Sequence, residues 1–378
     1  MASLSPEEIQ ALLEGPAATP PPGVSVNLDD PPNHRTAART ALMICFVIAT
    51  LAVILLVYTK AVMVRSFRLS DYSIVLAWGV FAGYFVPCWL TTIIAPGVDQ
   101  WNLRLKDFGT LLLYGNVGAT MYGIIIFFIK LSILLQFLEL FAPAGLTNTM
   151  YWACHSLIWI NLLFYLISTF LEIFSCKPRQ KAWNPLITSG SCIDTLVLNV
   201  AASAINAVSD LILLILPQLM IWRLRMAVQR RIAVSAVFLI AIFACVSSIT
   251  RLAYAILLFQ HPNNISHYLF LMGLWTIPEL ASGIVVACMP VMPRFFRSLK
   301  ASVLSSRLGA SLQGLLGRLS LRSWKTSSHS SQGSHSQPRP WFRGYEKYPD
   351  DLPLTQVARK TSSMGEAEAA GNPSPLGP

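Results

Sequence analysis

Residues 268–292 read YLFLMGLWTIPELASGIVVACMPVM, a run of 25 residues with one charged residue, Glu279. A segment of this length and polarity matches the hydrocarbon core of a bilayer, which a helix of about 20 apolar residues crosses. A helix also satisfies all of its backbone hydrogen bonds within the segment, as lipid requires. The stretch therefore predicts a transmembrane helix.

Six further runs of the same kind precede this one. The seven predicted spans, 19 to 28 residues long, are 41–59, 72–95, 111–138, 151–174, 196–221, 232–259 and 268–292. The composition agrees, because 54% of the 378 residues are hydrophobic and only 12% are charged, about half the charged share of a soluble domain. The predicted fold class is all-α, a polytopic membrane protein with a seven-helix transmembrane bundle in a lipid bilayer.

Three segments lie outside the spans. Residues 1–40 are Pro-rich, and we expect them to be extended and mobile, apart from a short helix opened by a capping box at Ser5 and closed at Gly15. Residues 293–325 mix apolar and basic residues, which predicts either an amphipathic helix on an anionic leaflet or a partly disordered basic stub. Residues 326–378 are rich in Ser, Pro and Gly and are expected to be disordered.

The distribution of Lys and Arg predicts the orientation, because short cytoplasmic loops carry an excess of them. Eleven lie on one side near the spans: Lys60, Arg65, Arg68, Arg223, Arg225, Arg230, Arg231, Arg294, Arg297, Lys300 and Arg307. Seven lie on the other: Arg35, Arg39, Arg104, Lys106, Lys177, Arg179 and Lys181. We therefore expect the N-terminus outside and the C-terminus in the cytoplasm, without a cleavable signal peptide, in the plasma membrane or another secretory-pathway membrane. The net charge of +10 beside the spans and in the tail favours anionic lipid over nucleic acid as a partner.

Two of the seven cysteines, Cys176 and Cys192, lie in a single predicted outer loop, while the other five fall within spans. An outer loop faces the oxidising side, where a disulfide persists. A bridge closing a loop of this size stabilises a protein by about 3 kcal/mol. The interpretation is a Cys176–Cys192 disulfide, with two free loop thiols as the alternative. A glycosylation sequon begins at Asn264, in a very short outer loop.

Charged residues inside spans are costly and therefore point to function. The set comprises Lys130, Glu172, Asp210, Arg251 and Glu279. Counted from the outer ends of their spans, Arg251, Glu279 and Asp210 differ by only about 5 to 9 Å in depth, which would place Arg251 between two acids. Lys130 counts as deeper. The cluster is interpreted as a polar clamp that fixes helix register, or as a functional site that lines a ligand cavity or takes part in a conformational switch, and the two interpretations do not exclude each other. Asn206, Asn199, Ser209 and Thr250 could extend the polar network.

Motifs of common enzymes are missing from the sequence: there is no GxSxG elbow, Walker A loop or HExxH helix, and no Cys or His pair has zinc spacing. A retinal Schiff base would need a lysine, and the last span contains none. The sequence therefore predicts a protein without catalytic, cofactor or metal sites.

The clearest motif runs from Phe174-Ser-Cys176-Lys-Pro178 through Trp183 to Gly190-Ser-Cys192-Ile-Asp194. Further matching residues lie in the last three spans and beside them: Asn206, Asp210, Pro217, Trp222, Arg230, Arg231, Arg251, Trp275, Glu279, Gly283, Cys288 and Pro290. Through these motifs, over roughly residues 15–300, the chain resembles the fungal rhodopsin-like integral membrane proteins, including the satratoxin-cluster membrane proteins. The resemblance implies seven helices without retinal, and a receptor-like protein or one encoded in a specialised-metabolite gene cluster.

Three functions remain open from the sequence. The first is a receptor-like, non-enzymatic protein that senses a small or lipophilic ligand and contacts a cytoplasmic signalling protein through Arg223, Arg225, Arg230 and Arg231. The second is an accessory membrane protein, a transporter or scaffold, of a mycotoxin or other metabolite pathway. The third is an intramembrane enzyme, which would need an acid pair such as Asp210 and Glu279 free of Arg251.

Overall fold

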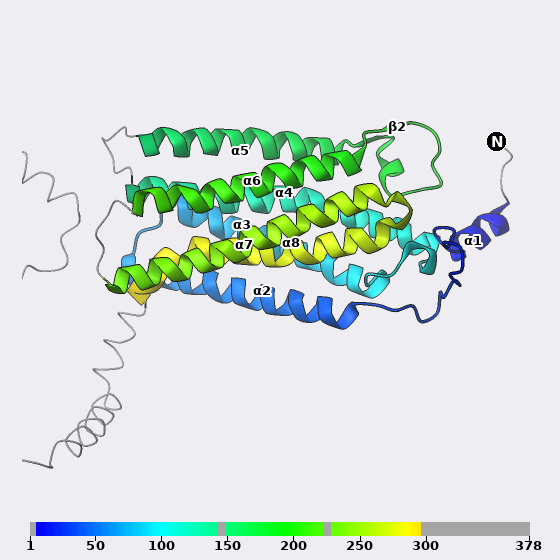
Figure 1. Cartoon of the computed structure of the whole chain (residues 1–378), viewed down its shortest axis with the longest axis horizontal. Helices are drawn as coiled ribbons and strands as arrows, with labels where there is room; N and C mark the ends of the chain where they lie inside the picture. Colours follow the sequence, from blue (N-terminus) through cyan, green and yellow to red (C-terminus); the bar gives the residue numbers. More distant parts are fainter. Residues whose placement is uncertain (1–4, 142–148, 222–227, 296–378) are drawn as a thin grey trace, which may run out of the picture. The chain divides into compact units, whose positions relative to one another are not determined.

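The computed structural model describes residues 5–141, 149–221 and 228–295. Among them, seven helices are long and apolar enough to cross a membrane, and they run side by side in Figure 1. They are α2 (Arg35–Tyr58), α3 (Leu69–Ile94), α4 (Leu105–Phe141), α5 (Thr149–Ile173), α6 (Thr195–Ile221), α7 (Val228–Gln260) and α8 (Ile265–Cys288). The predicted all-α seven-helix fold is confirmed, whereas the orientation of the termini stays a prediction. The tail at 326–378 and nearly all of the basic segment at 293–325 lie outside the described residues.

All seven helices begin before the residue that the hydropathy pattern predicted, and α2 and α4 do so by six residues each. Helix α2 starts at Arg35 rather than at residue 41. The Arg35 and Arg39 side chains bond to Thr92 of α3, so these polar residues are part of the helix and contact the bundle. Helix α4 starts at Leu105 rather than at residue 111 and is 37 residues long. Gly118, in the first half of α4, is a close packing position, since a Cβ on it would lie 3.3 Å from the ring of Tyr84.

Helix α8 lies at the centre of the bundle and packs against α2, α3, α4 and α7. Between Thr276 and Cys288 most of its side chains are buried. Helix α5, by contrast, packs mainly on α4 and exposes large apolar side chains such as Trp159, Leu163 and Phe170. Such a face suits contact with lipid. Helix α8 therefore forms the core of the bundle, and α5 presents a lipid-facing side.

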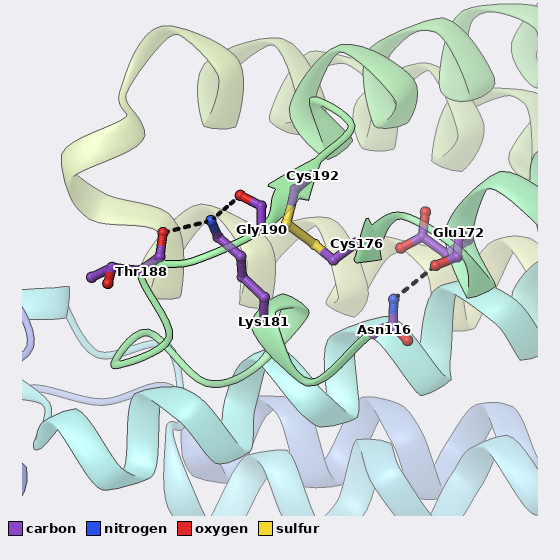
Figure 2. Close-up of a disulfide and its surroundings, with 7 residues drawn as sticks. All are labelled: Asn116, Glu172, Cys176, Lys181, Thr188, Gly190 and Cys192. Carbon is purple, nitrogen blue, oxygen red and sulfur yellow. Dashed lines mark hydrogen bonds between the residues drawn. A yellow bond between two sulfur atoms is a disulfide. The ribbon is translucent and has the colours of Figure 1, made fainter. Parts of the chain in front are cut away.

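The predicted disulfide between Cys176 and Cys192 is present and joins the two short antiparallel strands β1 (Cys176–Lys177) and β2 (Ser191–Cys192). Between the strands, the Lys181 Nζ donates to the carbonyl oxygens of Thr188 and Gly190, at 3.2 and 2.8 Å (Figure 2). We call the end of the bundle that carries this loop the disulfide end, and the other end of the bundle the opposite end.

The turn between α7 and α8 is bonded to the loop before α4 at the disulfide end. Asn264 Nδ2 donates to Asp99 Oδ1 at 2.7 Å, and its Oδ1 accepts from the Gln100 amide at 3.0 Å. The Ser266 hydroxyl, in the same sequon, donates to the Val98 carbonyl at 2.7 Å. The sequon is thus taken up in hydrogen bonds within the fold, and its glycosylation stays a prediction.

The segment before α2, predicted to be extended and mobile, contacts this end of the bundle. Its helix α1 (Pro6–Glu14) opens with the capping box expected at Ser5. The Glu14 carboxylate then pairs with Arg104 at 2.7 Å and with Lys106, at the start of α4. The hydrogen bond from Lys106, together with the charges of Lys106 and Arg104, lowers the pKa of Glu14 below its usual range. Polar contacts, which a hydropathy pattern does not reveal, therefore hold this segment against the start of α4.

Candidate functional site

Four charged side chains from four helices meet in the middle of the bundle and form two ion pairs. Lys130 of α4 lies 2.9 Å from Asp210 of α6, and Arg251 of α7 lies 2.8 Å from Glu279 of α8. Three of these side chains are at most 6% exposed, and Asp210 is 13% exposed. Removing such charges from water is costly unless they are paired and hydrogen-bonded. The two cations balance the two anions, so the cluster carries no net formal charge.

Asn206 of α6 joins the two ion pairs. Its Nδ2 lies 2.6 Å from Glu279 Oε1 and 3.1 Å from Asp210 Oδ2, and its backbone carbonyl accepts from Lys130 Nζ at 3.3 Å. Asn206 is completely buried. Because one side chain contacts both acids, a change in either pair alters the surroundings of the other.

Two tyrosine hydroxyls complete the network. Tyr122 of α4 donates to Glu279 Oε1 at 3.0 Å, and the Arg251 guanidinium carbon lies 4.5 Å from the centre of the Tyr122 ring. Tyr165 of α5 donates to Asn206 Oδ1 at 2.7 Å. A cation over an aromatic face is attracted to it, and a desolvated pair of this kind contributes about 2 kcal/mol. Both tyrosine hydroxyls thus donate hydrogen bonds to the cluster, and the Tyr122 ring also packs against Arg251.

The α6 side of the cluster follows from a simple spacing. Asn199, Ser203, Asn206 and Asp210 are separated by four, three and four residues, so they lie on one face of the helix. Ser203 Oγ accepts from Arg251 Nη1 at 3.1 Å, and Asn206 and Asp210 contact each other. This polar face of α6 gives the helix bonded contacts with both ion pairs.

The structure brings together the five residues predicted for the polar cluster, with a different pairing. The depth estimate placed Arg251 between two acids, whereas Arg251 pairs with Glu279, and Asp210 pairs with Lys130. The remaining polar residues differ in position. Glu172 lies near the end of α5, Ser209 bonds to Asn161, and Thr250 bonds to its own helix backbone: none of the three has a described bond to the ion pairs.

A cavity of about 510 Å³ opens on the disulfide side of the cluster. Apolar side chains and the disulfide loop line most of it, and Cys88 is part of its wall. Polar groups at its wall include Glu172 and Asn199, and Arg251 belongs to it as well. The volume is in the range of pockets that hold drug-sized molecules. We call it the disulfide-end cavity.

A second cavity, of about 720 Å³, lies on the other side of the cluster. Lys130, Asp210 and Glu279 line it, together with Cys245 and a mainly apolar set of side chains from α4, α6, α7 and α8. We call it the opposite-end cavity. The two ion pairs therefore lie between two cavities, with Arg251 at the wall of one and its partner Glu279 at the wall of the other.

The predicted contact site for a cytoplasmic partner lies only partly within the described residues. Arg223 and Arg225 lie outside the described residues. Arg230 and Arg231 belong to the first turn of α7. At the same end of the bundle, Asp71 pairs with Lys60 at 2.7 Å. Partner binding there stays a prediction.

Sequence reasoning missed the two tyrosines and Ser203, because an uncharged polar residue in an apolar span looks like ordinary packing. Their spacing was the available signal. Tyr122 precedes Lys130 by eight residues, just over two turns, so the two share one face of α4. Ser203 lies one turn before Asn206 on the polar face of α6.

Each buried acid of the cluster has a basic partner, Asp210 with Lys130 and Glu279 with Arg251. An intramembrane acid catalyst of the kind considered from the sequence would need both acids free of Arg251. The arrangement instead suits a charge-balanced link between helices that can also present a donor to a molecule in the cavity.

Comparison with known proteins agrees with the fold. The fungal rhodopsin domain matches residues 55–298. The fugralins biosynthesis cluster protein 2 of Gibberella zeae is 30% identical over 290 residues, which are 75% of this chain and 71% of that protein. A SAT4 family membrane protein of Emericella nidulans is 38% identical over 56% of this chain and 53% of its own length. The satratoxin biosynthesis SC1 cluster protein 4 of Stachybotrys chartarum is 24% identical over 38% of this chain and 51% of its own length.

Proposed function

The chain belongs to the fungal rhodopsin domain family, and from this we propose that it is a receptor-like, non-enzymatic membrane protein that senses a small apolar molecule. The ligand would bind in the disulfide-end cavity. With the predicted orientation, this cavity faces outside and the opposite end faces the cytoplasm. There, Arg223, Arg225, Arg230 and Arg231 would contact a signalling protein.

One observation carries the proposal: a single ion pair is shared by the walls of two cavities. Arg251 lines the disulfide-end cavity, and Glu279, 2.8 Å away, lines the opposite-end cavity. A ligand shifts a conformational equilibrium only through contacts that differ between the two states. A molecule that draws Arg251 toward the cavity would change its bond to Glu279, and through Asn206 the surroundings of Asp210.

Two native thiols can report on this coupling in the full chain. Cys88 lines the disulfide-end cavity and Cys245 lines the opposite-end cavity. The chain would be reconstituted in lipid nanodiscs and treated with N-ethylmaleimide, with a panel of drug-sized apolar compounds present or absent. Mass spectrometry would then give the labelling rate of each cysteine. We expect at least one compound to protect Cys88 directly and also to change the labelling rate of Cys245.

Cys45 is the internal control, since it lies in α2 and lines neither cavity. Its labelling rate should not depend on the compound. A compound that protects Cys88 and leaves Cys245 unchanged would show binding without transmission, which contradicts a receptor role. If no compound in the panel protects Cys88, ligand binding in this cavity is contradicted as well.

A second candidate function is that of an accessory membrane protein, a transporter or scaffold, in a specialised-metabolite pathway. Two of the relatives carry the names of biosynthesis cluster proteins, which favours this function. Genes for synthases and oxygenases flanking the gene of this protein would support it. A transporter would also carry the compound that protects Cys88 across a sealed vesicle membrane, whereas a receptor would bind that compound without flux.

A further inference from the structure

The Arg251 guanidinium is the one group of the two ion pairs with a terminal nitrogen that lacks a partner among the described residues. Its Nε donates to Glu279 Oε2 at 2.8 Å and its Nη1 to Ser203 Oγ at 3.1 Å. Its Nη2 is buried and has no hydrogen-bond acceptor in the part of the chain that the structure describes. The whole side chain is 6% exposed. A buried donor without an acceptor is unfavourable, so an acceptor that reached Nη2 would gain a bond to a charged group.

The charges around Arg251 decide which kind of acceptor fits. The positive charge of Arg251 is already balanced by Glu279, and that of Lys130 by Asp210. An anion in the cavity would add an unbalanced charge to a buried, neutral cluster, at a high cost in free energy. Besides Arg251, the cavity is lined by two acids, Glu172 and Asp194, and by one base, Lys181, so the wall offers no excess positive charge to hold an anion. A neutral oxygen, such as that of a carbonyl group, accepts the bond without adding a charge.

The cavity wall supports the same class of molecule. Most of its lining is apolar, so the body of the ligand should be apolar as well. Asn199 lines the same cavity one turn of α6 before Ser203, which accepts from Arg251. It offers a second polar contact near the guanidinium. The polar end of a ligand would therefore lie toward Arg251 and its apolar body toward the disulfide loop.

We propose that the disulfide-end cavity selects neutral, mainly apolar molecules that carry a carbonyl-type oxygen, which accepts a hydrogen bond from Arg251 Nη2. This inference rests on the proposed function, because it names the ligand class of the same cavity. Arg251 belongs to the cavity wall and its Nη2 is buried, so binding would require a small shift of the side chains around it. That shift is the movement by which the ligand would act on the Arg251–Glu279 pair.

Matched ketones and hydrocarbons test the role of the oxygen. Benzophenone differs from diphenylmethane, fluorenone from fluorene, and cyclododecanone from cyclododecane by a carbonyl in place of a methylene group. Each compound would be titrated against the full chain in nanodiscs, with protection of Cys88 from N-ethylmaleimide as the readout. For at least one pair we expect the ketone to protect at a concentration about tenfold or more below that of the hydrocarbon, as for a hydrogen bond to a charged donor.

The variant that removes the donor must not leave Glu279 unpaired. Arg251→Met together with Glu279→Gln removes both charges and keeps side chains of similar length. Thr250→Val is the matched control, because Thr250 neighbours Arg251 in α7 but bonds only to its own helix backbone among the described contacts. The ketone preference should disappear in the double variant and persist in the control. Comparing ratios between the variants also cancels unequal partition of the compounds into lipid.

The outcomes separate this inference from the proposed function. A ketone and its hydrocarbon that protect Cys88 equally would overturn the inference and leave ligand binding in place. A ketone preference that survives in the double variant would also overturn it, since another donor would then be responsible. If no compound protects Cys88, the proposed function fails at this cavity, and the inference fails with it.

Discussion

The two ion pairs have the same composition, one base and one acid, but they use their hydrogen-bonding capacity differently. Lys130 is bonded to Asp210 and to the Asn206 carbonyl, and its partner Asp210 is 13% exposed at the wall of the opposite-end cavity. Arg251 is held by Glu279 and Ser203 and stacks over Tyr122, yet one of its terminal nitrogens has no acceptor among residues 5–141, 149–221 and 228–295. Its partner Glu279 is 2% exposed.

Under the proposal above, this difference would make one buried charge pair a clamp alone and the other both a clamp and part of a binding site. The Lys130–Asp210 pair joins α4 to α6, and the described contacts account for it as a structural link. The Arg251–Glu279 pair joins α7 to α8 and in addition presents a donor beside a cavity. The clamp and the ligand cavity, which do not exclude each other in the sequence-based interpretation, would then be two parts of one cluster.

The largest expected effect comes from breaking the more buried pair. Arg251→Met alone leaves Glu279 charged and without its base, and we expect this to lower the free energy of unfolding by about 3 to 5 kcal/mol. Thermal unfolding of the full chain in nanodiscs would measure the loss. The double change with Glu279→Gln should restore most of it. A single variant as stable as the native chain would show that Glu279 does not depend on Arg251.

Breaking the other pair should have a smaller effect. Lys130→Met leaves Asp210 without a base, but Asp210 lies at a cavity wall and is the most exposed of the four charged side chains. We expect a loss of about 2 to 3 kcal/mol, which adding Asp210→Asn should reverse. The same unfolding measurement applies. A loss of stability larger than that of Arg251→Met would contradict the expectation that breaking the more buried pair costs more.

A double-mutant cycle would measure the link between the pairs. Combining Arg251→Met/Glu279→Gln with Lys130→Met/Asp210→Asn should give a coupling energy of about 1 kcal/mol, because Asn206 contacts both acids. In an Asn206→Ala background the coupling should fall below about 0.5 kcal/mol, the range of independent sites. Coupling that persists in this background would point to a route other than Asn206.

The smallest effect is expected where an ion pair lies at the surface. Hydrogen bonding from Lys106 lowers the pKa of Glu14, so the contact is fully present above the usual carboxyl pKa and is lost as the pH falls through the lowered value. A nitroxide attached at Leu12→Cys should therefore become more mobile in α1 as the pH falls below the usual range of a carboxyl pKa. Adding Glu14→Gln should remove this pH dependence. Mobility that rises at the same pH in both variants would exclude Glu14 as the cause.

Much of the fold could be predicted from the sequence, because lipid constrains it so strongly. Runs of about 20 apolar residues have few alternatives to a spanning helix, and the two loop cysteines pointed to the disulfide. Charges within spans were equally visible. The helix starts were less accurate, since Arg35 and Leu105 lie in helices whose polar contacts hydropathy does not report.

The pairing within the cluster could not be predicted in the same way. Counting residues gives the depth of a side chain along its own helix, but neither the tilt of that helix nor the place where it starts. Helix α4 starts six residues earlier than predicted, and Lys130 meets Asp210 although it counted as deeper. Tyr122 gave no signal beyond its spacing from Lys130, and Tyr165 gave none, because aromatic residues are common in spans that only pack.

The polar face of α6 restricts how this helix can move. Ser203 bonds Arg251, Asn206 contacts both acids, and Asp210 bonds Lys130, all along one line of the helix. A turn of α6 about its axis by one residue, about 100°, would pull all three away from their partners together. These three contacts therefore fix the rotation of α6 about its own axis relative to α4, α7 and α8.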